Sequence, residues 1–171
     1  MVRIRKAEKT DAEAIARVSV ASWLSTYRGI VPEKILQKIT HEQRTEAFKK
    51  RLNDKQHLLY IAETETGTVV GFINGGPERT GNTSFNGEIY SLYILDEYHH
   101  RQIGRQLVNV LAEQLQKDGI DSMLVWVLEE NPSKGFYEHL GGKQIDRQFL
   151  AELEAYEIAL GWKAIDKLIA I

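Results

Sequence analysis

The sequence contains no cysteine, which excludes disulfide bonds, thiolate ligands to metals and a cysteine nucleophile. It has no apolar run near the ~20 residues that a membrane-spanning helix requires, and Met1 to Lys6 lack the apolar region of a signal peptide. The formal net charge is only −2, which argues against broad nucleic-acid binding and against a polybasic membrane surface. These absences are compatible with the cytoplasm, where we expect the protein, with neither nucleic acid nor membrane as a partner.

What is present is typical of a globular protein. The chain has 171 residues, of which 43% are hydrophobic and 27% charged, and this is enough for one domain with a full core. No repeat, low-complexity segment or linker interrupts it, so we expect residues 1–171 to form a single domain. The histidines include no pair at metal-ligand spacing, so we expect no metal site.

Strand and helix patterns alternate along the chain. The predicted strands cover 2–7, 58–64, 69–74, 88–95 and 122–128, and two antiparallel strands follow within 143–162. The predicted helices begin at the capping-box pattern Thr10-x-x-Glu13 and at Pro32, and cover 42–52, 104–118 and 132–140. Residues 75–87 are expected to form a loop, and 150–156 also suit a helix. Alternating strands and helices from 88 to 140 imply parallel central strands, and the hairpins add antiparallel ones, so we predict an α/β fold with a mixed sheet.

The stretch from Glu88 to Val108 is the most informative part of the chain. It combines a β-favouring apolar run, a basic turn from His99 to Arg105, and the start of an amphipathic helix. A turn that opens a helix presents unpaired backbone N–H groups and the positive end of the helix dipole, which suits a phosphate or pyrophosphate. Gly104 removes a side chain where an anion would approach the backbone. The other interpretation is a solvated turn at a helix start.

This segment resembles the acetyl-CoA signature of the GCN5-related N-acetyltransferases, the GNAT family, which reads Gln/Arg-x-x-Gly-x-Gly/Ala between a strand and a helix. With the alignment set on Tyr98, His99 stands at the first fixed position, Gln102 at the first glycine and Gly104 at the second. Only the last fixed position therefore matches the family pattern. The resemblance implies that Gln102 must either avoid a positive φ or tolerate strain there.

A second block strengthens the resemblance. Residues 126–142, Trp-Val-Leu-Glu-Glu-Asn-Pro-Ser-Lys-Gly-Phe-Tyr-Glu-His-Leu-Gly-Gly, are similar to the family's strand, asparagine, and helix ending Phe-Tyr-Glu-x-Leu-Gly. Segments 4–16 and 22–29 also look like the family's opening strand and helix, so the resemblance covers nearly the whole chain. It implies a GNAT-type sheet that is mixed, mostly antiparallel and twisted, with splayed central parallel strands and flanking helices.

The resemblance implies acetyl-CoA as cosubstrate. The turn backbone would hold the pyrophosphate with Arg101 and Arg105 on its rim, and a strand N–H near Ile94 would polarise the thioester carbonyl. Asn131 would hydrogen-bond the pantetheine arm, a role compatible with the helix N-cap that its sequence position also suggests. The full set implied to contact acetyl-CoA is Leu92, Tyr93, Ile94, His99, His100, Arg101, Gln102, Ile103, Gly104, Arg105, Asn131, Ser133, Lys134 and Tyr137.

The resemblance also implies catalytic and acceptor residues. Tyr137 would protonate the departing thiolate, because a phenol of pKa near ~10 is protonated at neutral pH and the thiol that it helps to form has a pKa near ~8.5. Glu88 would accept the amine proton, directly or through water. Trp23 and Tyr27, four residues apart on one helical face, would line the acceptor side together with Tyr90. For these aromatic residues the alternative is core packing, and for Glu88 it is a solvated strand end.

We therefore predict an N-acetyltransferase in which an amine attacks acetyl-CoA directly. The acceptor is a small-molecule or peptide amine, and the weakly acidic charge balance favours small cationic amines. A CoA-binding sensor with little catalysis is the alternative, and a Rossmann-type nucleotide binder is weaker because the chain lacks the N-terminal Gly-x-Gly-x-x-Gly strand and the acidic residue after it. A homodimer is compatible with the resemblance.

Overall fold

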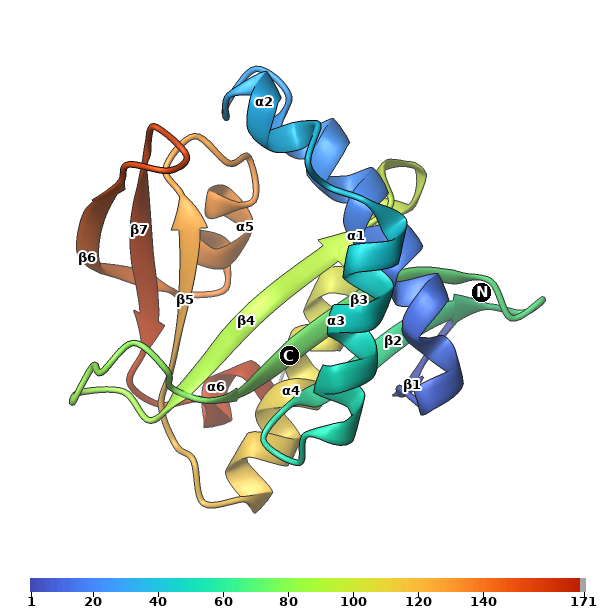
Figure 1. Ribbon diagram of the computed structural model, residues 1–171. Coiled ribbons are helices and arrows are strands. Elements are labelled where there is room, and N and C mark those ends of the chain that lie inside the picture. Colours follow the sequence, from blue (N-terminus) through green and yellow to red (C-terminus); the bar gives the residue numbers. More distant parts are fainter. Residues whose placement is uncertain (170–171) are drawn as a thin grey trace.

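The computed structural model describes residues 1–169, in which seven strands form one twisted sheet (Figure 1). The strands are β1 (Val2–Lys6), β2 (Leu58–Thr64), β3 (Val69–Pro77), β4 (Gly87–Ile94), β5 (Met123–Leu128), β6 (Lys143–Leu150) and β7 (Ala155–Trp162). They lie in the order β1-β2-β3-β4-β5-β7-β6, and every neighbouring pair is antiparallel except β4 and β5. This arrangement confirms the predicted mixed sheet with a central parallel pair.

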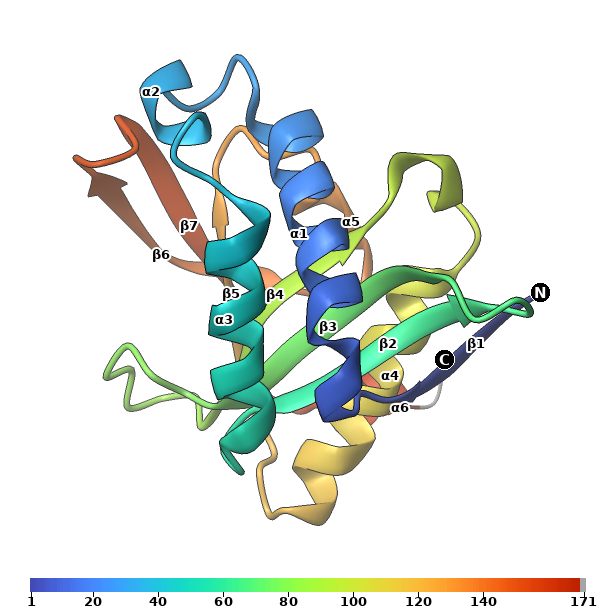
Figure 2. The same ribbon diagram turned by 45° about the vertical axis from the view of Figure 1, so that its right-hand side comes forward.

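Helices cover both faces of this sheet. They are α1 (Ala12–Tyr27), α2 (Glu33–Leu36), α3 (His41–Asn53), α4 (Ile103–Lys117), α5 (Lys134–His139) and α6 (Asp166–Ile169). The antiparallel helices α1 and α3 lie side by side across one face (Figure 2), and α4 packs on the other face. In the part of the chain that the structure describes, no helix is both long and apolar enough to cross a lipid bilayer.

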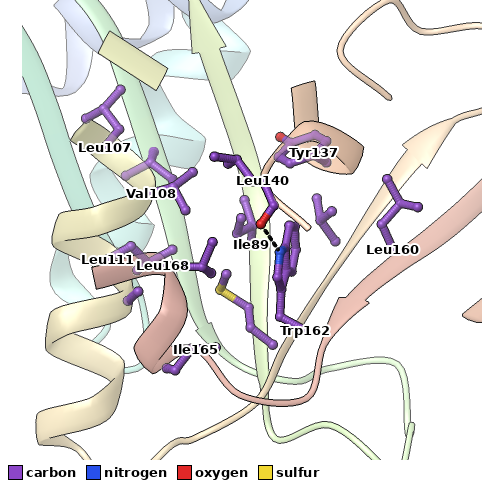
Figure 3. Close-up of a cluster of buried hydrophobic side chains, with 14 of the residues drawn as sticks. Ile89, Leu107, Val108, Leu111, Tyr137, Leu140, Leu160, Trp162, Ile165 and Leu168 are labelled. Carbon is purple, nitrogen blue, oxygen red and sulfur yellow. Dashed lines mark hydrogen bonds between the residues drawn. The ribbon is translucent and has the colours of Figure 1, made fainter. Parts of the chain in front are cut away.

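Alternation along β3 divides the core into two layers. Phe72 is fully buried against α1 and α3, where its ring meets that of Phe48 at 5.2 Å, whereas Ile73 is fully buried against α4. The α4 layer continues under α5 and β7, where the indole N–H of Trp162 donates to the Leu140 carbonyl at 3.1 Å (Figure 3). Strands β2 and β3 are therefore buried on both sides, which fits their long apolar runs.

Two boundaries differ from the sequence prediction around residues 75–87. Strand β3 continues to Pro77 and β4 already begins at Gly87, so the loop covers only 78–86. The glycines that suggested a loop instead allow close packing, because a Cβ on Gly75 would lie 2.6 Å from Leu111 Cδ2 and 2.8 Å from the Glu88 carbonyl oxygen. In addition, 150–156 forms the end of β6, a turn and the start of β7, not a helix.

The predicted capping box at Thr10 and Glu13 is wrong. The residue before α1 is Asp11, and its carboxylate turns back to accept a hydrogen bond from the Glu8 N–H at 2.7 Å. The same carboxylate pairs with Arg5 at 2.9 Å. Asp11 therefore joins the chain entering α1 to β1, a contact that the local pattern alone does not indicate.

The parallel pair β4–β5 is short, and this determines the shape of the site. The strands pair only from Gly87↔Met123 to Ile89↔Val125. Against β3, Ser91 pairs with Asn74 while Ile89 pairs with Gly75, so Tyr90 is an extra residue in β4, a β-bulge. A bulge bends a strand and increases its twist, and β4 and β5 diverge beyond it (Figure 1). Within the described residues 1–169, the backbone of β4 after Tyr90 thus has no partner strand on its β5 side.

Candidate functional site

The basic turn between β4 and α4 has the features of an anion site. Helix α4 begins at Ile103, and its first backbone bond runs from the Gln106 N–H to the Gln102 carbonyl at 3.1 Å. Within residues 1–169, no hydrogen-bond partner is found for the backbone N–H groups from His100 to Arg105. Unpaired N–H groups at the N-terminus of a long helix attract anions through both hydrogen bonds and the helix dipole.

The sign of φ alternates along the turn backbone. His100 has φ of +61° and Gln102 has φ of +65°, both outside the regions that most side chains prefer. Of the two expectations for Gln102, the structure therefore shows the one in which the residue adopts a positive φ at the position of the family's first glycine. Successive N–H groups in such an alternating backbone form a concave anion-binding nest.

Gln102→Gly should raise the free energy of unfolding by about 0.5–1 kcal/mol. A left-handed conformation costs a non-glycine residue roughly 1–2 kcal/mol, and glycine avoids this cost. Glycine also loses more conformational entropy on folding, which reduces the gain in stability by about 0.5–1 kcal/mol. The Gln102 side chain makes no cap bond that would be lost. Urea denaturation measures the change. Gln106→Gly, on the exposed side of the same helix, is the matched control and should destabilise; a loss of stability in Gln102→Gly as well would contradict the argument.

The side chains of the turn lie around these N–H groups. Arg101 is exposed, and its guanidinium lies 4.9 Å from the Tyr98 ring centroid, while Arg105 is half-buried. His99 Nε2 lies 2.8 Å from the Ile94 carbonyl oxygen, which links the turn to the end of β4. A pocket beside the turn is lined by Tyr98, Arg101, Ile103 and Gln106 together with the ends of β1 and β2. Positive charge therefore surrounds the free N–H groups.

Gly104 has a different role from the one expected. It is buried, and a Cβ there would lie 3.0 Å from Phe136 Cζ and 3.4 Å from Ile94 Cδ1. The absent side chain would thus point into the molecule, toward α5 and β4. The glycine allows the first turn of α4 to approach these elements closely, and it places the free N–H groups beside Ile94 at the end of β4.

Asn131 connects the loop after β5 to α1. Its Oδ1 accepts hydrogen bonds from the Ser133 N–H and hydroxyl, both at 2.8 Å, and its Nδ2 donates to the Tyr27 hydroxyl at 2.9 Å. Helix α5 begins at Lys134 with Ser133 as its N-cap, so the prediction of Asn131 as N-cap is wrong. The side chain forms an Asx turn instead, because its Oδ1 accepts a hydrogen bond from the backbone N–H two residues ahead.

Asn131→Ala should lower the free energy of unfolding by about 1–3 kcal/mol, since the buried Tyr27 hydroxyl and the Ser133 N–H both lose a partner. Chemical denaturation measures the loss. Glu130→Ala, at the exposed neighbouring position, is the control and should change stability little. Equal stability of Asn131→Ala and the wild type would show that water replaces the amide at no cost.

Three tyrosines gather beside Asn131. The hydroxyls of Tyr27 and Tyr93 lie 3.3 Å apart, and burial raises the pKa of both. Tyr137 is 3% exposed and packs its ring 6.2 Å from that of Trp162 (Figure 3). Burial, and then the neighbouring Tyr27, raise the Tyr137 pKa well above the usual phenol value. Its hydroxyl has no hydrogen-bond partner among residues 1–169, so it is a protonated donor with no competing acceptor.

The acceptor-side residues also adopt definite positions. The Trp23 ring centroid lies 4.4 Å from that of Tyr27, as their shared helical face predicts. Glu88 is only 2% exposed, and its carboxylate accepts from the backbone N–H and the Nη2 of Arg79, both at 3.0 Å. The Arg79 guanidinium stacks on the Tyr90 ring at 3.6 Å. Glu88 is thus a paired, buried carboxylate and not a solvated strand end.

The structure therefore brings the expected residues into two groups. Asn131, Tyr27, Trp23 and Tyr137 belong to one, whereas Glu88 and Tyr90 belong to a second at the start of β4; no hydrogen bond in the described chain joins Glu88 to Tyr137. Sequence reasoning missed Arg79, because it lies in a loop with no periodicity. Clusters of three or more histidine, aspartate or glutamate side chains arranged to hold a metal ion are absent from residues 1–169.

Comparisons with known proteins agree with this geometry. The family model described as "Acetyltransferase (GNAT) family" matches residues 20–142. The chain is 34% identical over 170 residues to "Uncharacterized N-acetyltransferase YuaI" of Bacillus subtilis (strain 168), covering 98% of this chain and 96% of that protein. It is 28% identical over 141 residues to "Spermidine N(1)-acetyltransferase" of Thermoplasma acidophilum, covering 79% and 83% of the two chains.

Solved structures of the same kind share the fold. The PaiA N-acetyltransferase of Thermoplasma acidophilum in complex with coenzyme A has a TM-score of 0.77 at 24% identity, covering 95% of this chain and 99% of that chain. YncA of Salmonella typhimurium, solved with acetyl-CoA, has a TM-score of 0.72 at 18% identity, covering 95% and 93%.

Proposed function

This chain belongs to the acetyltransferase (GNAT) family and is an acetyl-CoA-dependent N-acetyltransferase, and we propose that it acetylates a primary amine by direct attack on the thioester. The observation that carries the proposal is the turn from His100 to Arg105 with its free N–H groups, which follows the segment of β4 that no longer pairs with β5. A nucleotide-linked thioester needs both features: an anion site for its phosphates and an open strand edge for its amide-containing arm.

The proposed cosubstrate contacts follow from this arrangement. The turn and the rim cations Arg101 and Arg105 bind the pyrophosphate. The unpaired β4 edge, with Leu92, Tyr93 and Ile94, receives the pantetheine amides as an added strand would be received, and an N–H near Ile94 polarises the thioester carbonyl. The remaining contacts come from the turn and the start of α5, through His99, His100, Gln102, Ile103, Gly104, Asn131, Ser133 and Lys134.

The proposed reaction has no covalent enzyme intermediate. The amine nitrogen forms the new N–C bond as the C–S bond breaks. The amine proton passes to Glu88, directly or through water, and the Tyr137 hydroxyl proton passes to the leaving sulfur. With its raised pKa, the Tyr137 phenol is protonated throughout the neutral range. Trp23, Tyr27 and Tyr90 form the aromatic wall for the acceptor, and the main contribution of the protein is to hold amine and thioester in line.

The test is release of CoA thiol from acetyl-CoA in the presence of an amine panel. The panel includes amino acids, an aminoglycoside, a peptide with a free N-terminus, a lysine peptide and spermidine, the last because of a relative named for it. Amine-dependent thiol release with a matching acetylated product supports the proposal. Tight CoA binding with no turnover of any amine would contradict it and favour a CoA-binding sensor.

A further inference from the structure

Helix α3 presents two arginines toward the sheet. Arg44, Phe48 and Arg51 are spaced at i, i+4 and i+7, so they share one face of the helix. Phe48 is 1% exposed and belongs to the core layer between α3, α1 and the sheet, which identifies the inward face. Figure 2 shows α3 running across the sheet beside α1. The two guanidinium groups therefore lie at the inner side of this helix layer and not on its outer surface.

Neither arginine has a carboxylate partner within residues 1–169. Arg44 donates one hydrogen bond, to the Ser19 hydroxyl at 3.1 Å, and lies 5.1 Å from the Trp23 ring centroid. Arg51 lies 4.9 Å from the Phe48 ring centroid. Each guanidinium has five N–H donors, so most of their hydrogen-bonding capacity is unused. Burying such groups without a counter-ion is costly, and a bound anion would remove the cost.

Arg44 lies close to the groups of the proposed reaction, and Arg51 follows it two turns later on the same face of α3. Burial, and then the charges of Arg44 and Arg79, lower the Arg51 pKa. The Trp23 ring under the Arg44 guanidinium has its centroid 4.4 Å from that of Tyr27. Burial lowers the Arg44 pKa, and the nearby Tyr93 and Tyr27 act in the opposite direction. The Tyr27 hydroxyl also accepts the hydrogen bond from Asn131 Nδ2. Positive charge thus stands on the α3 side of the candidate reaction centre.

Strands β4 and β7 carry acidic side chains. Glu88 on β4 is paired with Arg79, so those two charges largely cancel. Glu157 on β7 is partly buried and accepts a hydrogen bond from Gln148. It lies opposite Leu128 of β5, which packs in the same cluster as Tyr27. The region around Tyr27 therefore combines an α3 cation that has no carboxylate partner among residues 1–169 with a partly buried carboxylate on β7. A ligand that complements both the α3 cations and the carboxylate has an amine, cationic or neutral, and an anionic group.

We propose that the acceptor is a small amine that carries an oxyanion, either a carboxylate or a phosphorus oxyanion, bound by Arg44 and Arg51. This rests on the acetyltransferase activity proposed above. The planar guanidinium fork matches both kinds of oxyanion, and an oxyanion bound there leaves the amine free to point toward the strand side of the region, where Glu157 lies. The weakly acidic charge of the whole chain favours a purely cationic amine, but the local field of the α3 arginines opposes one.

The experiment compares matched acceptors. Amino acids, their carboxamides, the corresponding decarboxylated amines, aminophosphonates and spermidine are assayed for CoA thiol release with the wild-type enzyme. We expect kcat/KM for acceptors with an oxyanion to exceed that for the matched carboxamides at least about tenfold, since hydrogen bonds to a charged group are lost. Carboxylate and phosphonate acceptors are scored separately, which identifies the preferred oxyanion.

Variants then assign the effect to the arginines. Arg44→Gln and Arg51→Gln should raise KM for the preferred oxyanion-bearing acceptor about 10–100-fold and change KM for its uncharged analogue much less. Arg44→Lys keeps the positive charge, so it serves as a second variant in case Arg44→Gln does not fold. Lys50→Gln, an exposed cation on the same helix, should change neither KM.

The outcomes separate the two proposals. Turnover that is equal or better with carboxamides or spermidine, or an equal rise in KM for charged and uncharged acceptors in Arg44→Gln, would overturn the inference and leave the acetyltransferase proposal intact. No turnover of any amine would instead overturn the proposed function, and this inference with it.

Discussion

Tyr137→Phe should reduce kcat by roughly 10²–10⁴ and leave the Kd for acetyl-CoA nearly unchanged. Phenylalanine keeps the ring that packs between Phe136 and Trp162, so the core should tolerate it. What disappears is the hydroxyl, which has no protein partner in residues 1–169 and therefore no structural role to lose. The raised pKa means that the wild-type phenol is protonated and able to donate at any ordinary assay pH.

Two measurements decide this prediction. The loss in kcat should shrink with an acyl donor whose leaving thiol has a lower pKa, because that thiolate departs without a proton. Tyr60→Phe, a buried tyrosine of β2 outside the site, is the matched control and should keep wild-type kcat. A Tyr137→Phe enzyme with wild-type kcat at saturating amine, where chemistry limits the rate, would reduce Tyr137 to a core aromatic.

Gly104→Val should weaken acetyl-CoA and CoA binding by about a hundredfold or more and also lower stability by roughly 1–3 kcal/mol. Its Cβ would lie 3.0 Å from Phe136 Cζ and 3.4 Å from Ile94 Cδ1, and the two added methyl groups cannot fit there. The first turn of α4 must move away from α5 and β4. The N–H groups that would bind the phosphates move with it, and each hydrogen bond to a charged group contributes roughly 1.5–3 kcal/mol.

Calorimetric titration with CoA measures the loss of affinity, and thermal unfolding measures the loss of stability. Gly75→Ala is the matched overpacking control, since its Cβ would lie 2.6 Å from Leu111 Cδ2, in the core and away from the turn. It should destabilise the protein but keep wild-type CoA affinity. Similar CoA affinities in Gly104→Val and Gly75→Ala would show that this turn does not bind the phosphates.

Much of the fold could be predicted because it depends on local pattern. The apolar alternation and helical spacing locate β4, α4 and β5 almost as the structure has them. The basic turn could be predicted as an anion site because a helix N-terminus carries free N–H groups whatever surrounds it. Family resemblance added the roles proposed for Asn131 and Tyr137, which no periodicity indicates.

The sequence by itself thus determined the order of strands and helices, the mixed sheet and the position of the basic turn, since hydrophobic period and helix-end chemistry act over a few residues. Only the tertiary structure decided that Tyr27 meets Asn131, 104 residues further along the chain, and that Arg79 meets Glu88. The same holds for the bulge at Tyr90 and the face to which Arg44 points. Such contacts depend on strand register and helix packing, where side chains from distant segments compete for the same space, and no local preference encodes the outcome of that competition.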